Sequence, residues 1–414
     1  MNFSLSRNRV NPPFSIAFAT APHLVSFKPV NNCDMNASFF DEHRIRLIQA
    51  PMAGSQNHRL AAAVFFAGGM GSIPAAMLTA EQLQSELSAF EDAIAAVKEK
   101  AKAHQWGEFL PVNVNFFCHT PPPAQNEREA AWRQKLAPLY LAHGIDPLSL
   151  GSGPGRAPFS EESLKLVGQF KPAVVSFHFG LPKAQWVQQI KDWGVQIWSS
   201  ATTVQEAQWL AQQGVDAIIA QGLEAGGHRG MFLTEDLSTQ LGTLSLLPQL
   251  VKAVSLPIIA AGGISSPAAV CAAKALGASA VQVGTAFLTS HEATTSALHR
   301  QALMSSSAQH TALTNLFSGR PARGIVNNFM REFGPLNAQA PSFPLATAAV
   351  APLRAAAEAK GLSDFSPLWS GQNASDCEAL PAADIAHKLL KGWPDASCFS
   401  FGNTTVLGLG HGQR

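Results

Sequence analysis

Short apolar segments alternate with longer amphipathic segments along most of the chain. Each apolar segment is followed by a turn and then by apolar positions at three- and four-residue spacing, which predicts a strand followed by a helix. Strands are predicted at residues 45–50, 71–74, 110–116, 173–177, 196–198, 217–220, 257–260 and 280–283. Helices are predicted at residues 57–67, 79–102, 184–193, 203–213, 241–253 and 267–276.

Several of the predicted strands are apolar throughout, for example residues 173–175 and 258–259. Such runs are typical of a parallel sheet that is covered on both faces. Strand–helix alternation can build either an open doubly wound sheet or a closed barrel. Eight units, with glycine loops after the sixth, seventh and eighth strands, favour the barrel. The sequence therefore predicts the α/β class and a (β/α)₈ TIM barrel.

Three parts of the chain depart from the alternation. A Pro-rich insertion follows the third strand, begins at residues 121–123 and contains one or two helices before residue 170. After about residue 290 the alternation stops, and we expect helices at 353–360 and 382–390 joined by loops. We expect a barrel domain over residues 35–290 and a partly helical C-terminal extension, residues 291–414, that packs over the barrel and the site.

The first 34 residues carry basic side chains and scattered Phe and Pro without periodicity, and we expect a poorly structured extension. A coherent pattern begins just after Met35, which makes this methionine a candidate for the true start of the protein. Mass spectrometry of the native N-terminus tests this hypothesis, and a mature end near residue 1 refutes it.

Composition narrows the function classes. Of the 414 residues, 46% are apolar and only 14% are charged, and the net charge is +1. This balance favours a large buried core and a small-molecule substrate over nucleic acid or an anionic membrane. The uncharged stretch 60–78 contains three glycines and a proline, so it is a poor membrane helix. Five widely spaced cysteines without a CxxC pair indicate neither zinc nor disulfides, and we expect a cytoplasmic protein.

Glycine loops follow the last two predicted strands. The segment AAGGIS (260–265) follows the seventh strand, and Gly284 and Thr285 follow the eighth. Loops at these positions of a TIM barrel often bind phosphate, because backbone N–H groups can approach its oxygens closely. Two such loops on adjacent strands predict a phosphate site.

The loop after the sixth strand, QGLEAGGHRG (221–230), places a histidine among small residues. The lack of side-chain bulk would let a flat ligand lie against the backbone with the imidazole of His228 beside it. A structural or surface histidine is the usual case, but it would leave the glycines around His228 unexplained. We interpret His228 as a catalytic residue.

These segments together resemble the nitronate monooxygenase family, formerly called 2-nitropropane dioxygenases, and its class I members in particular. The matching segments are QAPMAG (49–54), VNVNFF (112–117), SFHFG (176–180), the loop 221–230, AAGGI (260–264), QVGT (282–285) and SGRPARG (318–324). The resemblance covers about residues 45–375 in one order.

The resemblance implies an FMN-dependent oxidoreductase that oxidises alkyl nitronates such as propionate 3-nitronate with O₂, yielding carbonyl compounds and nitrite or nitrate. It implies His228 as the catalytic histidine and His178 as a residue of the substrate pocket, with no metal. The residues implied for FMN are Ala50, Pro51, Met52, Ala53, Asn115, Gln221, Gly226, Gly227, Gly262, Gly263, Gln282, Val283, Gly284 and Thr285. We expect a monomer or a homodimer.

One position departs from the family pattern. A tyrosine commonly faces the substrate in a Tyr-Pro segment, whereas this chain has Phe343 before Pro344, and its single tyrosine is Tyr140. We therefore expect Phe343 to contact the substrate without a hydroxyl, which affects substrate preference more than FMN binding. Other polar residues have plainer interpretations: His119 is expected at the surface or in a loop, and Glu224 orients Arg229 or caps a turn.

Two other functions remain open from the sequence. An NAD(P)H-dependent FMN quinone or enoyl-thioester reductase of the same superfamily would share the glycine–histidine loop, although no GxGxxG fingerprint follows a strand here. A non-redox TIM-barrel isomerase or synthase would use the phosphate loops without a flavin, but it would leave the loop 221–230 and Asn115 without a role.

Overall fold

The computed structural model describes residues 38–100, 106–147, 150–151 and 156–393, with side chains left undescribed at 96–100. The predicted N-terminal extension and its candidate start at Met35 lie outside the described residues.

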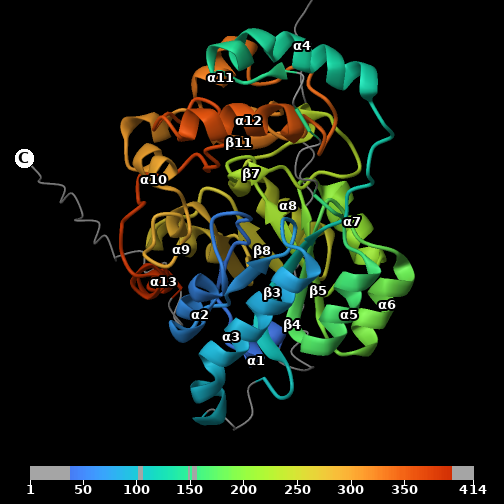
Figure 1. Ribbon diagram of the computed structural model, residues 1–414. Helices are drawn as coiled ribbons and strands as arrows, with labels where there is room; N and C mark the ends of the chain where they lie inside the picture. The colour runs from blue at the N-terminus through green and yellow to red at the C-terminus, as the bar shows by residue number, and fades with distance from the viewer. Residues whose placement is uncertain (1–37, 101–105, 148–149, 152–155, 394–414) are drawn as a thin grey trace, which may run out of the picture. The chain divides into compact units, whose positions relative to one another are not determined.

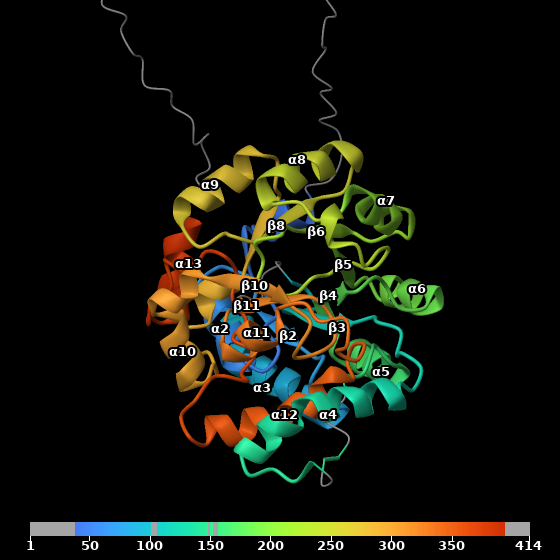
Figure 2. The same ribbon diagram turned by 90° about the horizontal axis from the view of Figure 1, so that it is seen from above.

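Eight parallel strands form one sheet in the order β1-β9-β8-β6-β5-β4-β3-β2. The strands are β1 Leu47–Gln49, β2 Ser72–Pro74, β3 Leu110–Phe117, β4 Pro172–His178, β5 Gln196–Ala201, β6 Ala217–Gln221, β8 Ile258–Ala261 and β9 Ala280–Val283. The two ends of this order meet and close the barrel. Ile48 of β1 forms a parallel bridge with Met70, which lies just before β2, and Gln49 donates its N–H to the Met70 carbonyl at 2.9 Å. The predicted eight-stranded barrel is confirmed (Figure 2).

Apolar side chains fill the barrel interior and close its lower end. Ile48, Ile219 and Ile259 belong to one buried cluster with Trp198. Phe40, from the short helix α1 (Phe39–Glu42), stacks on Trp198 with ring centroids 5.2 Å apart. Figure 1 shows α1 at one end of the barrel and β7 at the other. Ligand space is therefore left at the carboxyl ends of the strands.

Helices cover the outside of the barrel. They are α2 His58–Phe66, α3 Ala80–Lys100, α5 Glu161–Phe170, α6 Ala184–Asp192, α7 Val204–Gln212, α8 Thr243–Ala253 and α9 Pro267–Ala275. Helix α3 begins with a capping box, since Gln82 donates its N–H to Thr79 Oγ1 at 3.2 Å and its side-chain oxygen accepts the Thr79 N–H at 2.9 Å. Leu87 and Phe90 lie on the buried face of this helix.

The helix that completes the barrel comes from near the end of the chain. Helix α13 (Ala382–Leu390) packs beside α2 and α9 (Figure 2). Its residues Ile385 and Leu389 belong to the same buried cluster as the strands and surrounding helices. The segment between β9 and α13 is therefore inserted between the last strand and its helix. The expected domain boundary at residue 290 remains a prediction.

This inserted segment contains strands that the sequence analysis did not anticipate. Strands β10 (Thr311–Thr314) and β11 (Ala322–Ile325) pair antiparallel, and β11 also pairs with the two-residue strand β7 (Gly227–His228). The expectation of helices joined only by loops was wrong here, because four-residue strands carry too little alternation to be recognised.

Helices form a layer over the opening of the barrel. They are α4 Asn126–Ala142 from the insertion after β3, and α10 Ala297–Leu303, α11 Asn328–Phe333 and α12 Ala346–Glu358 from the later segment. Tyr140 of α4 donates its hydroxyl hydrogen to the Ala349 carbonyl of α12 at 2.7 Å, and Trp132 is fully buried. The two predicted departures from alternation therefore pack together (Figure 1). Within the described residues, no helix has the length and apolar character to span a bilayer.

Candidate active site

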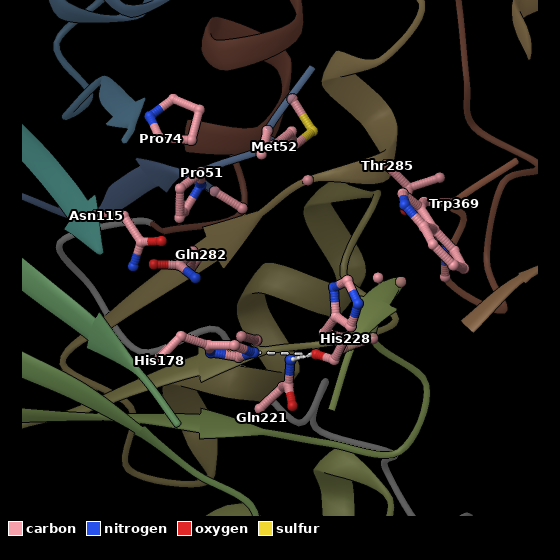
Figure 3. Close-up of a pocket in the computed structure, with 18 of the residues that line it drawn as sticks. Pro51, Met52, Pro74, Asn115, His178, Gln221, His228, Gln282, Thr285 and Trp369 are labelled. Atoms are coloured by element: carbon pink, nitrogen blue, oxygen red, sulfur yellow. Dashed lines mark hydrogen bonds between the residues drawn. The ribbon is translucent and has the colours of Figure 1, made fainter. Parts of the chain in front are cut away.

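A cavity lies at the carboxyl ends of the barrel strands. Most of the residues that the resemblance implied for FMN line it: Ala50, Pro51, Met52, Ala53, Asn115, Gln221, Gly226, Gly227, Gly262, Gly263, Gln282, Gly284 and Thr285. His178 and His228 line it as well (Figure 3). The fold thus brings segments from β1, β3, β4, β6, β8 and β9 to one place.

The glycine loops after β8 and β9 form one end of this cavity. A Cβ on Gly262 would lie 2.9 Å from Thr243 Oγ1 and 3.1 Å from the Ala225 nitrogen, and its φ of +117° disfavours any side chain. Helix α9 begins after this loop with Ser266 as its N-cap, and Pro267 occupies its first position. The loop therefore keeps its backbone exposed close to a helix N-terminus, an arrangement suited to an anion.

Gln282 supplies an unpaired polar group to the same cavity. Its Oε1 is buried and has no hydrogen-bond partner among the described residues. Val283 lies differently from what was expected: its side chain packs in the core between the strands and the helices, because successive residues of β9 face opposite sides. Val283 serves through its carbonyl, which accepts the Ala50 N–H at 2.8 Å.

His228 is held in place by its backbone. It pairs with Ala322 through the β7–β11 ladder, and its carbonyl oxygen accepts from Gln221 Nε2 at 2.9 Å. His178 Nε2 lies 3.1 Å from the same carbonyl oxygen, while its Nδ1 lies 3.0 Å from Ser200 Oγ. Both ring nitrogens of His178 thus have protein partners. This histidine lines the cavity, but its polar atoms hold the His228 loop instead of facing a substrate.

The imidazole of His228 is half-buried among aromatic rings. Its centroid lies 6.0 Å from Phe117, 5.3 Å from Phe343 and 5.6 Å from Trp369. Burial, and after it the positive charge of Arg156, lower the pKa of His228 well below its usual value. The imidazole is therefore neutral at physiological pH.

Ser318 is the one hydrogen-bond partner of the His228 ring among the described residues, with Oγ 2.8 Å from Nε2. The serine hydroxyl also lies 3.4 Å from the Arg320 carbonyl, to which it can donate. Ser318 belongs to the SGRPARG segment, so the sequence carried a signal for it, but no role was assigned to it from sequence.

Phe343 is not among the residues that line the cavity, and its ring packs against the His228 imidazole with centroids 5.3 Å apart, so its expected contact with the substrate stays a prediction. His119 lies in a loop, one of its two expected positions, but this loop is buried: the ring packs edge-on against Phe343 with centroids 4.8 Å apart and is only 6% exposed. Burial lowers the pKa of His119 to about 4, and both its ring nitrogens are buried without a hydrogen-bond partner among the described residues.

A segment from the end of the inserted region closes the cavity beside the glycine loops. Trp369, Gly371 and Asn373 line the wall, and the Gly371 N–H donates to Thr285 Oγ1 at 2.9 Å. A Cβ on Gly226 would lie 2.6 Å from the Gly371 nitrogen, so the glycine permits this close approach. Sequence reasoning missed this segment, because a single Trp-Ser-Gly run has no periodicity or spacing that marks a site.

Arg229 and Glu224 stabilise the loop between β6 and β7. The buried Arg229 guanidinium donates to the carbonyl oxygens of Gln221 at 2.8 Å and Gly222 at 2.7 Å. The Glu224 carboxylate accepts the Thr243 N–H at 2.8 Å, at the start of α8. Glu224 therefore caps a helix, and no direct bond between it and Arg229 is present.

The comparisons with known proteins point to one family. The nitronate monooxygenase family model matches residues 39–392. This chain belongs to the nitronate monooxygenase family. Its relatives include the nitronate monooxygenases of Paraburkholderia phytofirmans, 39% identical over 345 residues, and of Pseudomonas aeruginosa, 39% identical over 354 residues. The alignments cover 83% of this chain in both cases, and 90% and 95% of those proteins.

Solved structures agree with this membership. Nitroalkane oxidase from Streptomyces ansochromogenes matches with a TM-score of 0.76 and 34% identity, covering 86% of this chain and 99% of that one. FabK from Thermotoga maritima shares the fold, with a TM-score of 0.61 at 24% identity over 87% of this chain and 96% of that one. The resemblance seen in the sequence motifs is confirmed, and the protein is an oxidoreductase of this family.

Proposed function

We propose that this protein is an FMN-dependent nitronate monooxygenase that oxidises alkyl nitronates, such as propionate 3-nitronate, with O₂ to carbonyl compounds and nitrite or nitrate. The observation that carries the proposal is the position of His228. A neutral, half-buried imidazole lies in the wall of the same cavity as the glycine loops after β8 and β9. Such an arrangement suits a cofactor with a phosphate at one end and a reactive ring at the other.

The polar groups of the cavity fit FMN. The buried Oε1 of Gln282 has no hydrogen-bond partner among the described residues, and an N–H group of the flavin ring would supply one. Gly262 lets the loop after β8 pack closely on Ala225 and Thr243, and this loop lines the cavity just before the N-terminus of α9, where phosphate oxygens are favoured. Asn115 is already held by Ser176, since its Nδ2 donates to Ser176 Oγ at 3.0 Å, so its amide is oriented before any ligand binds.

Different parts of the wall would hold different parts of FMN. Gly262, Gly263, Gly284 and Thr285 would hold the phosphate, and residues 50–53 with Asn115 and Gln282 would contact the ribityl chain and the ring. When bound, FMN supplies the redox chemistry, accepting electrons from the substrate and passing them to O₂. The chain's own residues bind and orient the substrate and control one proton.

Nδ1 of His228 can serve either an anionic nitronate or a neutral nitroalkane. Nδ1 makes no hydrogen bond with the described residues, whereas Nε2 is beside the Ser318 hydroxyl. If Ser318 donates to Nε2, Nδ1 carries the proton and can donate to a nitronate oxygen. If Ser318 accepts from Nε2 and donates to the Arg320 carbonyl, Nδ1 is free to accept a proton from a neutral nitroalkane.

The electrostatics of the wall favour the same substrate class. Among the described residues that line the cavity there is no aspartate or glutamate, and Arg156 carries a positive charge. A nitronate is an anion delocalised over carbon and two oxygens, so it can give up electrons without a strong base. This charge balance supports a nitronate over a cationic substrate.

Anaerobic stopped-flow mixing tests the proposal. The purified protein should show flavin absorbance at roughly 370 and 450 nm, and propionate 3-nitronate should bleach the longer-wavelength band rapidly. NADH and NADPH should do so far more slowly. Rapid reduction by NADPH with no reaction toward the nitronate would instead favour a reductase, and a colourless protein that takes up no FMN would overturn the proposal.

A further inference from the structure

Arg156 is a charged side chain in the cavity wall, and no motif in the sequence marks it. It lies in the insertion after β3, shortly before α5, and no acidic residue lines the cavity with it among the residues that the structure describes. A cation in a largely enclosed wall is costly unless something pairs with it.

The guanidinium has few protein partners. Its Nη1 donates to Thr347 Oγ1 at 2.8 Å, and its Cζ lies 5.9 Å from the centroid of Phe343. Within the described part of the chain it forms no ion pair with a carboxylate. Burial lowers the pKa of Arg156, and the neighbouring positive charge of Arg354 lowers it further, so its neighbours add positive charge instead of balancing it.

The nearby Arg320 is different. Its guanidinium lies 4.1 Å from the centroid of Phe179 and donates to the Met231 carbonyl, and the negative charges of Glu235 and Glu206 act on it. The positive charge of Arg320 is therefore partly balanced by carboxylates of the protein itself. Only Arg156 combines a place in the cavity wall with an unbalanced charge.

We propose that the Arg156 guanidinium binds a second acidic group, a carboxylate, at the far end of the nitronate substrate. This assignment rests on the proposed function. Arg156 and His228 both lie against the ring of Phe343, with Cζ and the imidazole centroid 5.9 and 5.3 Å from it. A substrate with a short chain between nitronate and carboxylate can therefore reach both residues.

The chemistry of the two groups fits this assignment. A guanidinium presents parallel N–H donors that match the two oxygens of a carboxylate, and such charge-assisted pairs are strong where water is excluded. Thr347 fixes one edge of the guanidinium and is itself held, since its hydroxyl donates to the Phe317 carbonyl at 3.1 Å. Thr347 is thus a positioning residue, and Arg156 sets the preference for carboxylate-bearing nitronates over plain alkyl nitronates.

The test compares two substrates in wild type and in Arg156→Gln. Propionate 3-nitronate carries the carboxylate, and 1-butyl nitronate replaces it with an apolar end on a chain of matched length. We expect Arg156→Gln to lower kcat/KM for propionate 3-nitronate about 30- to 100-fold, mainly through KM, because a partly buried charge pair is lost. The value for 1-butyl nitronate should change less than about threefold.

Three further variants control the result. Arg156→Lys keeps the charge and should recover part of the loss. Thr347→Val should give a smaller loss, about three- to fivefold, that is again specific to propionate 3-nitronate. Arg331→Gln removes an exposed arginine whose guanidinium bonds Asn328, and it should leave both substrates unaffected. Equal losses on both nitronates in Arg156→Gln, or no loss on either, would overturn the assignment.

Binding of succinate gives a readout that does not depend on turnover. Succinate has two carboxylates at a short spacing, and calorimetry should show its affinity falling at least tenfold in Arg156→Gln and not in Arg331→Gln. If wild type reacts with neither nitronate, the proposed function fails, while the succinate titration still decides the role of Arg156. Unchanged succinate affinity in Arg156→Gln would overturn that role.

Discussion

The two ends of the cavity are built in opposite ways. At the phosphate end, Gly262 and Thr285 follow two adjacent strands directly, and the chain around them is regular. At the histidine end, His228 meets Ser318, Phe343 and Arg156, which come from the segment after β9 and from the insertion after β3. A site made by neighbouring strand ends is a property of the barrel, whereas a site made by distant segments depends on how those segments fold back.

This contrast predicts that the two ends can be damaged separately. Variants at the phosphate end should change cofactor retention and leave substrate preference intact. Variants at the histidine end should change substrate turnover or preference and leave cofactor retention intact.

The largest effect is expected from His228→Ala. Removing the imidazole should lower kcat/KM for neutral nitroethane about 100- to 1000-fold, because a general base is lost, and for ethyl nitronate only about tenfold, because that substrate is already deprotonated. Steady-state oxygen consumption with both substrates measures this difference. The bound flavin should stay at the wild-type ratio, and a variant that loses its flavin would break the proposed separation of the two ends.

Gly262→Ala should have the next largest effect, and on the other property. The added Cβ would meet Thr243 Oγ1 and the Ala225 nitrogen, and φ of +117° is strained for alanine, at a cost of about 2–3 kcal/mol. We expect FMN affinity to fall roughly 30- to 100-fold in fluorescence titrations of the apoprotein. Gly151→Ala is the matched control, because a Cβ there meets nothing within 4 Å.

Acid should destabilise the histidine end selectively. His299 Nε2 lies 3.0 Å from the Trp369 carbonyl, and burial lowers the pKa of His299 from 6.5 to about 4. The folded protein then binds fewer protons than the unfolded chain between these values. The contribution of this histidine to the free energy of unfolding is fully present above pH 6.5. It is lost as the pH falls toward 4, and the loss is about 2 kcal/mol at pH 5.

Urea unfolding at pH 7 and pH 5 measures this loss. His299→Gln keeps a group that can donate to the Trp369 carbonyl but does not titrate, so it should reduce the pH dependence. His310→Gln, at an exposed position, is the control and should keep the wild-type slope. If the free energy of unfolding of His299→Gln fell between pH 7 and pH 5 as much as that of wild type, the titration of His299 would not cause the pH dependence.

Phe343→Tyr should have the smallest effect. It restores the hydroxyl that the family commonly carries, but Phe343 packs behind His228 instead of lining the cavity. We expect kcat/KM for nitronates to change less than about threefold, with unchanged flavin content. A gain above tenfold would mean that this hydroxyl reaches the substrate and that the histidine end is more open than the structure indicates.

Sequence reasoning was accurate where local pattern and site coincide. The eight strands, the glycine loops after the sixth to eighth strands and the place of His228 in the loop after β6 followed from residues adjacent in the chain. Burial by distant segments did not follow from them: His119 was expected at the surface or in a loop, and it lies in a loop that is buried beside Phe343. Sequence reasoning also missed that α13 completes the barrel, because a helix alone does not state which neighbours it will pack against.

The amino-acid sequence by itself determined the barrel, the phosphate-end loops and the family, since periodicity and glycine spacing act over a few residues. Only the tertiary structure decided the histidine end. It showed that both nitrogens of His178 are occupied, that Ser318 is the partner of His228, and that Arg156 lacks a balancing charge. The physical reason is that burial and charge pairing are set by contacts between segments far apart in the chain, which no local pattern records.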